Sequence, residues 1–158
     1  MSLQTALNDL QSKVGTETDL SDWYAVTQEK INAFADATGD HQWIHVDPER
    51  ASRESPFGAP VAHGYFTLSL IPHLAGRVDP DKPLYPNVRL SVNYGLNRVR
   101  FPHPVPAGSR IRARTVLQSV EEVKGNGLQL VNKVTIEIDG EEKPACVAET
   151  VSRMYFDA

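Results

Sequence analysis

The sequence contains one cysteine, Cys146, among its 158 residues. A single thiol excludes an internal disulfide and supplies no cysteine cluster for a structural zinc site. The chain also lacks an excess of basic residues: its formal net charge is -4 and its pI is about 5.7. This acidic balance argues against nonspecific binding of nucleic acid. We therefore expect a cytoplasmic protein without a nucleic-acid partner.

Long apolar runs are also missing. No run approaches the roughly 20 residues that span a bilayer, and the start, MSLQTALNDLQSKVG, has neither a basic leader nor an apolar block. We expect neither secretion nor a membrane span. The sequence shows no internal repeat, low-complexity segment or linker, and 41% of its residues are hydrophobic. It is thus predicted to form one globular domain over residues 1–158, long enough to bury a core.

The first half of the chain carries helix signals. Apolar residues at helical spacing predict a first helix within residues 1–15, closed by a glycine. A second helix is expected between Thr27, which can cap its start, and Gly39, which ends it. Asp47, followed by a proline, is typical of the start of a third, short helix. Residues 38–51 are therefore predicted to lie mainly in a loop between helices.

Residues 62–76 are apolar nearly all round, which indicates a helix buried in the middle of the protein. Strand-forming runs separated by turn signals follow it, at residues 88–101, 109–120, 127–138 and 143–156. Helices thus precede antiparallel strands without βαβ alternation. The predicted fold class is α+β, with a curved antiparallel sheet wrapped around one long central helix.

The segment 38–51, TGDHQWIHVDPERA, holds two of the five histidines. Asp40 and His45 follow a glycine at which the chain can turn, so a carboxylate and an imidazole can face one point and hold a water between them. Such a pair can act as acid and base. Spacing alone fits a structural role better, with Asp40 capping a turn and His45 as a satisfied polar residue.

A metal site is a third interpretation of the same segment. Its ligands would be Asp40, His41, His45 and Asp47. No further histidine stands at ligand spacing, and the residues that would orient these ligands cannot be named. We therefore expect no metal here.

Ala62, His63 and Gly64 begin the predicted central helix, where unpaired backbone N–H groups and the positive end of the helix dipole point outward. Gly64 has no side chain to block close approach. Its N–H can therefore donate to a thioester carbonyl whose oxygen becomes negative as an enolate forms. A need for tight packing explains the glycine equally well.

Together these residues resemble a known family. The run FADATGDHQWIH, from Phe34 to His45, resembles the hydratase 2 motif of MaoC-like, (R)-specific enoyl-CoA hydratases, and AHG at 62–64 resembles the helix start of the same single-domain hotdog proteins. NYGLNRVRFP at 93–102 and VPAGSRIR at 105–112 are similar to strand and turn segments of actinobacterial members. The family commonly has asparagine and proline where this chain has Gln42 and Trp43, a difference that bears on substrate choice.

The resemblance implies a hotdog fold and reversible hydration of trans-2-enoyl-CoA to (R)-3-hydroxyacyl-CoA in fatty-acid metabolism. It implies that Asp40 and His45 deprotonate the attacking water and that the Gly64 N–H holds the thioester oxygen. It implies no metal or redox cofactor, since coenzyme A is part of the substrate, and at least a homodimer, since the sheet has exposed edges. The residues expected to contact substrate are His63, Gln42, Trp43 and Tyr65.

Two functions from other classes remain open. A hotdog acyl-CoA thioesterase would typically present a carboxylate from the central helix, whereas the segment from Gly64 to Leu74 has none. A non-catalytic acyl-CoA-binding module would keep the groove but would not need an acid/base pair. The pairing of Asp40 with His45 is therefore the feature that separates a hydratase from a binding module.

Overall fold

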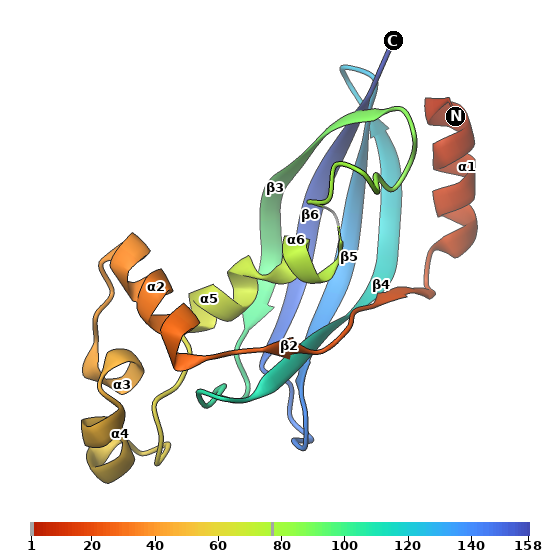
Figure 1. Ribbon diagram of the computed structural model, residues 1–158. Coiled ribbons are helices and arrows are strands. Elements are labelled where there is room, and N and C mark those ends of the chain that lie inside the picture. Colours follow the sequence, from red (N-terminus) through yellow and green to blue (C-terminus); the bar gives the residue numbers. More distant parts are fainter. Residues whose placement is uncertain (1, 77) are drawn as a thin grey trace.

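The computed structural model describes residues 2–76 and 78–158 (Figure 1). None of the helices in these ranges is long and apolar enough to cross a membrane. The helices largely precede the strands, and the predicted α+β class is confirmed. The elements are, in chain order, α1 (Leu3–Lys13), β1 (Glu17–Leu20), β2 (Tyr24–Ala25), α2 (Gln28–Thr38), α3 (Trp43–Val46), α4 (Pro48–Glu54), α5 (Gly64–Ser69), α6 (Ile71–Leu74), β3 (Val88–Arg100), β4 (Arg110–Val123), β5 (Gly127–Ile138) and β6 (Cys146–Phe156).

The strands form one antiparallel sheet in the order β1-β4-β5-β6-β3, with β2 also paired to β4. The consecutive helices α5 and α6 lie across this sheet, while α2, α3 and α4 gather near the start of α5 (Figure 1). This arrangement of a sheet around a central helical segment is a hotdog fold. It brings the loop after α2 next to the beginning of α5.

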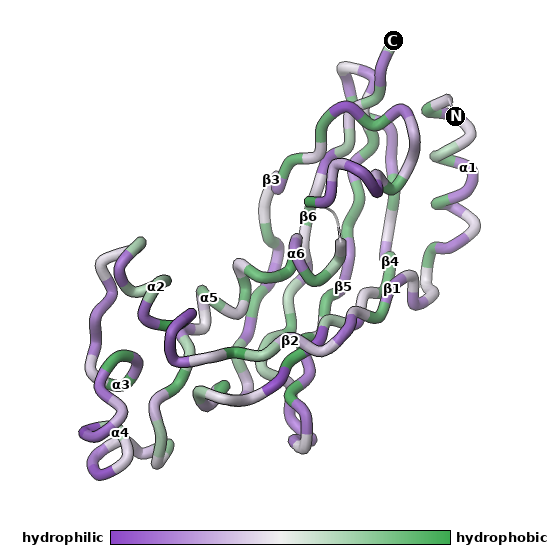
Figure 2. The backbone as a smooth tube through the Cα atoms, viewed as in Figure 1, coloured by the Kyte–Doolittle hydropathy of each residue, from purple (hydrophilic) through white to green (hydrophobic). Residues whose placement is uncertain are grey.

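The core follows from the alternation of residues along the strands, where hydrophobic and hydrophilic positions follow one another (Figure 2). Phe66, Leu70 and Leu74 of the central segment pack in one cluster with Ile111 and Ile136 of the sheet. A second cluster, under α1, contains other residues of β4, β5 and β6. The sheet is therefore covered by two apolar clusters that lie side by side.

The predicted helix boundaries around the sequence motif are confirmed. The Thr27 side chain accepts from the Lys30 N–H at 3.2 Å, and Gly39 closes α2 in the left-handed region at φ 80°. Glycine adopts this conformation without the steric cost that a side chain would add. Asp47 caps α4 by accepting from the Arg50 N–H at 3.0 Å.

The central helix departs from the expectation for residues 62–76. It begins at Gly64 and is interrupted at Leu70, so that α5 and α6 replace one long helix. Pro72 has no N–H to donate to the carbonyl one turn earlier, which favours a break at this point. The segment 38–51 also differs from a plain loop, because the one-turn helix α3 contains His45.

The sheet differs from the sequence expectation mainly at strand ends. β1 was not predicted, β4 continues to Val123, and β6 begins at Cys146 rather than at residue 143. Pro144 precedes β6 and cannot donate to a strand ladder, which explains the later start. These differences leave the order of the elements as predicted.

Candidate active site

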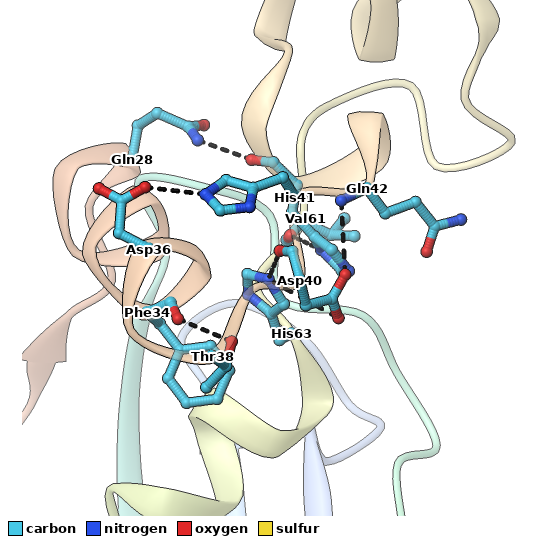
Figure 3. A network of polar contacts seen from close by, with 10 residues as sticks. Gln28, Phe34, Asp36, Thr38, Asp40, His41, Gln42, Val61 and His63 are labelled. Atoms are coloured by element: carbon cyan, nitrogen blue, oxygen red, sulfur yellow. Dashed lines mark hydrogen bonds and ion pairs between the residues drawn. The ribbon is translucent and has the colours of Figure 1, made fainter.

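Three side chains from separate elements meet at one point beside α5. Asp40 follows the left-handed Gly39 at the end of α2, His45 lies in α3, and His63 caps the start of α5. One carboxylate oxygen and one nitrogen from each imidazole all lie within 4.8 Å of one another. Figure 3 shows the Asp40 and His63 side chains close together. The fold thus assembles the predicted pair, Asp40 and His45, and adds His63.

His45 is held in one orientation by the backbone. The residue is 8% exposed, and its Nδ1 lies 2.6 Å from the carbonyl oxygen of Val61. Because a carbonyl only accepts, Nδ1 carries the proton and donates, which leaves Nε2 of the neutral ring unprotonated. Nε2 can therefore accept a proton from a water molecule.

Burial lowers the pKa of His45 below its ordinary value of 6.5, and the nearby His63 lowers it further. The hydrogen bond to the Val61 carbonyl and the charge of Asp40 act in the opposite direction, but burial is the largest cause. A low-dielectric environment disfavours the charged imidazolium. His45 is thus a neutral base at neutral pH.

Asp40 presents its carboxylate to solvent beside His45. Its side chain is 53% exposed, and Oδ2 lies 4.0 Å from His63 Nε2. Oδ1 accepts from the Gln42 N–H at 3.4 Å, which fixes the start of the loop. A water that bonds to two groups sits about 2.8 Å from each. The spacing within the cluster therefore suits one water held between Asp40 and His45.

His63 is 3% exposed and lies between the loop and the central helix. Its Nε2 donates to the backbone carbonyl of Asp40 at 2.9 Å, and its ring also packs against Phe34, with centroids 4.8 Å apart. Nδ1 has no hydrogen-bond partner in the described part of the chain. These contacts fix the loop that carries Asp40; the expected contact between His63 and substrate stays a prediction.

The residues weighed as metal ligands from the sequence are not brought together as one set. The exposed His41 pairs with Asp36, at 2.8 Å, and Asp47 caps α4. The cluster that does form contains two histidines whose rings are stacked, with centroids 3.8 Å apart and planes 22° apart. Imidazole lone pairs lie in the ring plane, so two nearly parallel rings in a stack cannot both point at one ion. The geometry of His45 and His63 does not fit a shared metal.

Gly64 is the first residue of α5, and its missing side chain matters for packing. A Cβ placed there would lie 3.1 Å from the Phe101 ring. Within the described residues no side chain caps the start of α5, so the Gly64 N–H is left for another acceptor. The structure therefore gives a packing reason for the glycine and is compatible with the oxyanion role as well.

The other residues expected to contact substrate lie outside the three-residue cluster. Tyr65 is 73% exposed and meets Phe101 edge to face. Gln42 is exposed, and the Trp43 ring carries the Arg50 guanidinium 4.2 Å from its centroid. Their roles in binding remain predictions.

A cavity of about 430 Å³ was not foreseen from the sequence. It lies between the central segment, from Leu68 to Ala75, and the strands β3 to β6. Leu68 follows Gly64 by four residues, which is about 6 Å along a helix. The volume is within the range of small-molecule sites, and its walls are mainly apolar. Its position beside α5 is suited to an acyl chain.

Residues 9–138 match the family model described as MaoC like domain. The chain belongs to the MaoC-like family. It is 51% identical over 145 residues to 3-hydroxyacyl-thioester dehydratase Z of Mycobacterium tuberculosis (strain ATCC 25618 / H37Rv), a match that covers 92% of this chain and 93% of that protein. The resemblance seen in the sequence is thus confirmed.

Two further likenesses extend over nearly the whole MaoC-like chain. Nodulation protein N of Rhizobium leguminosarum bv. viciae is 44% identical over 154 residues, with 98% of this chain and 94% of that protein covered. The solved structure of the (R)-hydratase from A. caviae involved in PHA biosynthesis is 23% identical and has a TM-score of 0.66. The match covers 88% of this chain and 94% of that chain. The latter likeness supports the fold.

Proposed function

We propose that this MaoC-like protein is a hydro-lyase that reversibly adds water to trans-2-enoyl-CoA and forms (R)-3-hydroxyacyl-CoA, as a step of fatty-acid metabolism. The observation that carries the proposal is the convergence of the Asp40 carboxylate with a buried His45 whose Nδ1 is fixed by the Val61 carbonyl. The 51% identity to a protein named as a 3-hydroxyacyl-thioester dehydratase supports the same reaction in its reverse direction.

In the proposed mechanism, a water between Asp40 and His45 loses a proton to the pair as its oxygen attacks C3. The pair returns a proton to C2 on the same face of the double bond, which gives syn addition. One carboxylate oxygen of Asp40 and one ring nitrogen of His45 lie within 4.8 Å of each other, so both can reach the same water. The proton is therefore assigned to the pair rather than to one member.

The Gly64 N–H is proposed to stabilise the negative charge on the thioester oxygen as the enolate forms. Removal of such a donor typically costs about 3 kcal/mol. The cavity beyond Leu68 would take the acyl chain, while the exposed Gln42, the neighbouring Trp43 and Tyr65 would contact the rest of the substrate. His63, which contacts Asp40 and His45, would position the pair.

No metal or redox cofactor takes part in this proposal. Addition of water to a double bond conjugated with a thioester changes no oxidation state overall and needs only proton transfer and charge stabilisation. The stacked rings of His45 and His63 support a mechanism without a metal, since they cannot converge on one ion.

We further propose a homodimer. β3 lies at one edge of the sheet, and its exposed side chains include Leu90, Tyr94 and Leu96. An apolar edge strand is suited to pairing with a second copy. Leu96 also lines the acyl cavity, so a second subunit on β3 would help to close it.

A cytoplasmic location completes the proposal and is consistent with the buried free thiol of Cys146.

The deciding experiment is a spectrophotometric assay of the purified protein against trans-2-enoyl-CoAs of graded length, together with quantification of free CoA. The proposal expects loss of the enoyl absorbance without release of CoA. Release of free CoA would instead indicate a thioesterase. Tight binding without turnover of any chain length would indicate a non-catalytic acyl-CoA-binding module.

A further inference from the structure

Two polar residues interrupt the apolar inner face of the sheet. Thr115 of β4 and Asn132 of β5 are each 3% exposed. Their neighbours two residues away on the same strands are buried and apolar: Ala113 and Leu117 on β4, and Leu130 and Val134 on β5. Side chains two residues apart lie on one face of a strand. Thr115 and Asn132 thus occupy core positions.

The two residues lie close to each other across neighbouring strands. Thr115 is paired with Val134, and Leu117 is paired with Asn132, so that Thr115 and Asn132 are diagonal neighbours on one face. On one side of them lies the cluster that includes Ala113 and Val134, and on the other side lies the cluster under α1, with Leu117 and Leu130. They form a polar seam between the two halves of the core.

The seam offers hydrogen-bonding atoms that the described protein atoms do not use. Thr115 Oγ1 and Asn132 Oδ1 are both buried and lack a hydrogen-bond partner in residues 2–76 and 78–158. Unpartnered buried polar atoms are rare in native folds, and they usually bind water or a ligand. Both residues line the cavity proposed to take the acyl chain, and both also line a neighbouring cavity of about 340 Å³ whose lining includes Lys13, Glu17 and Lys82.

The chemistry of the cavity restricts what the seam can bind. Among the described residues, no lining residue carries a charged side chain, and the polar ones other than the seam are small hydroxyl or amide residues: Ser69, Ser91, Asn93, Thr150 and Ser152. Among the described residues that line the acyl cavity, a charged substituent would lose its hydration without meeting a counter-ion. A hydroxyl group is neutral, donates to the Asn132 amide oxygen, and accepts from the Thr115 hydroxyl.

We propose that Thr115 and Asn132 are specificity-determining residues that recognise a hydroxyl group on the acyl chain of the substrate. The preferred substrates are then enoyl thioesters with a hydroxyl beyond the reacting double bond, rather than plain hydrocarbon chains. This inference rests on the proposed function insofar as the cavity takes the acyl chain of the reacting thioester.

The test compares pairs of trans-2-enoyl-CoAs that differ only in one hydroxyl, placed at successive carbons beyond C3. The wild-type protein is expected to show a kcat/KM at least about tenfold higher for the hydroxylated member at one position, because a site with polar groups rejects an analogue that leaves them unpaired. Thr115→Val and Asn132→Leu should each reduce this ratio toward one. Thr135→Val makes the same change as Thr115→Val on the other face of the sheet and should leave the ratio unchanged.

The variants should also fold, because replacement of an unpartnered buried polar group by an apolar group of similar size is neutral or stabilising. Melting temperatures of the free proteins check this point. A wild-type preference for the plain chain at every position overturns the inference, as does an equal ratio in wild type and both seam variants. Equal turnover of each pair by the wild type would mean that the seam binds only an ordered water, and it also overturns the inference.

Failure of the proposed function would look different. In that case the wild type would hydrate neither member of any pair. Calorimetric binding of saturated acyl-CoA and hydroxyacyl-CoA then tests the seam without chemistry. A preference for the hydroxylated ligand that is lost in Asn132→Leu would support the inference, and equal Kd values for the two ligands would overturn it.

Discussion

The imidazole rings of His45 and His63 are stacked, with centroids 3.8 Å apart and planes that differ by 22°. The stack joins two elements, because His45 belongs to α3 and His63 caps α5. His63 also donates to the backbone carbonyl of Asp40. One buried ring therefore contacts the proposed base and fixes the loop that carries the proposed carboxylate.

We expect the activity to persist into mildly acidic solution. The reaction requires neutral His45, and burial lowers the pKa of this residue below 6.5. The neutral form is thus fully present above pH 6.5 and is lost only as the pH falls through the lower pKa of the folded protein. A profile of kcat/KM against pH checks this, and an acidic limb centred above pH 6.5 would contradict the assignment.

Replacement of His63 by phenylalanine tests its positioning role. The variant retains an aromatic ring in the stack but loses the hydrogen bond to the Asp40 carbonyl. If the loss of about 1 kcal/mol that is typical of one hydrogen bond is felt in the transition state, kcat/KM should decrease roughly fivefold. The repulsion that lowers the pKa of His45 also disappears, so the acidic limb should move to higher pH. A pH profile of the purified variant measures both effects.

His41→Phe is the matched control, since His41 is an exposed histidine of the same loop that pairs with Asp36 outside the cluster. The acidic limb of the kcat/KM–pH profile of His41→Phe should coincide with that of the wild type. If His63→Phe reduces the rate without any movement of the limb, His63 has only a structural role.

Substitution of Gly64 separates packing from catalysis. An alanine Cβ would lie 3.1 Å from the Phe101 ring, so Gly64→Ala should be mildly destabilising, and Gly64→Val should cost about 1 to 3 kcal/mol of stability. If the N–H also holds the thioester oxygen, Gly64→Val should in addition reduce kcat steeply for every chain length. Thermal unfolding and single-turnover hydration, measured on the same samples, resolve the two roles. A destabilised Val variant with full turnover per folded molecule would refute the oxyanion role.

Asp40→Asn and His45→Gln should each reduce hydration by about 10²- to 10⁴-fold, the usual contribution of a general acid or base. Both proteins should keep the wild-type circular dichroism spectrum. Asp47→Asn is a suitable control, because asparagine caps a helix about as well as aspartate and Asp47 caps α4. Near-normal turnover in either folded variant of the pair would remove that residue from the mechanism.

The sequence predicted those parts of the site that depend on local signals. Gly39 and Thr27 delimit α2 as expected, and the turn at Gly39 places Asp40 where His45 can approach it. These features are local because a capping side chain or a left-handed glycine acts within a few residues. The order of helices and strands was predicted from the spacing of apolar residues, which is also a local property of the sequence.

The features that were missed depend on contacts between distant segments. The carbonyl that orients His45 belongs to Val61, sixteen residues away. Every residue has a backbone carbonyl, so the residue type at position 61 does not reveal this hydrogen bond. The stacking of His63 on His45 likewise requires the fold, although both residues were singled out. In the sequence, Thr115 and Asn132 look like any other polar residues of a strand. Only the pairing register of β4 and β5 shows that both lie on the inner face of the sheet. Gly64 had two equally good explanations because the neighbouring Phe101 is far away in sequence.

The most direct test of the central claim is chiral analysis of the product formed from crotonyl-CoA. The water proposed between Asp40 and His45 would supply the hydroxyl, and the pair the proton, to one face of the substrate. The proposed (R) specificity fixes which face this is. The account predicts (R)-3-hydroxybutyryl-CoA as the product of the wild-type protein. Predominant (S) product, or free CoA without any hydroxyacyl-CoA, would contradict it.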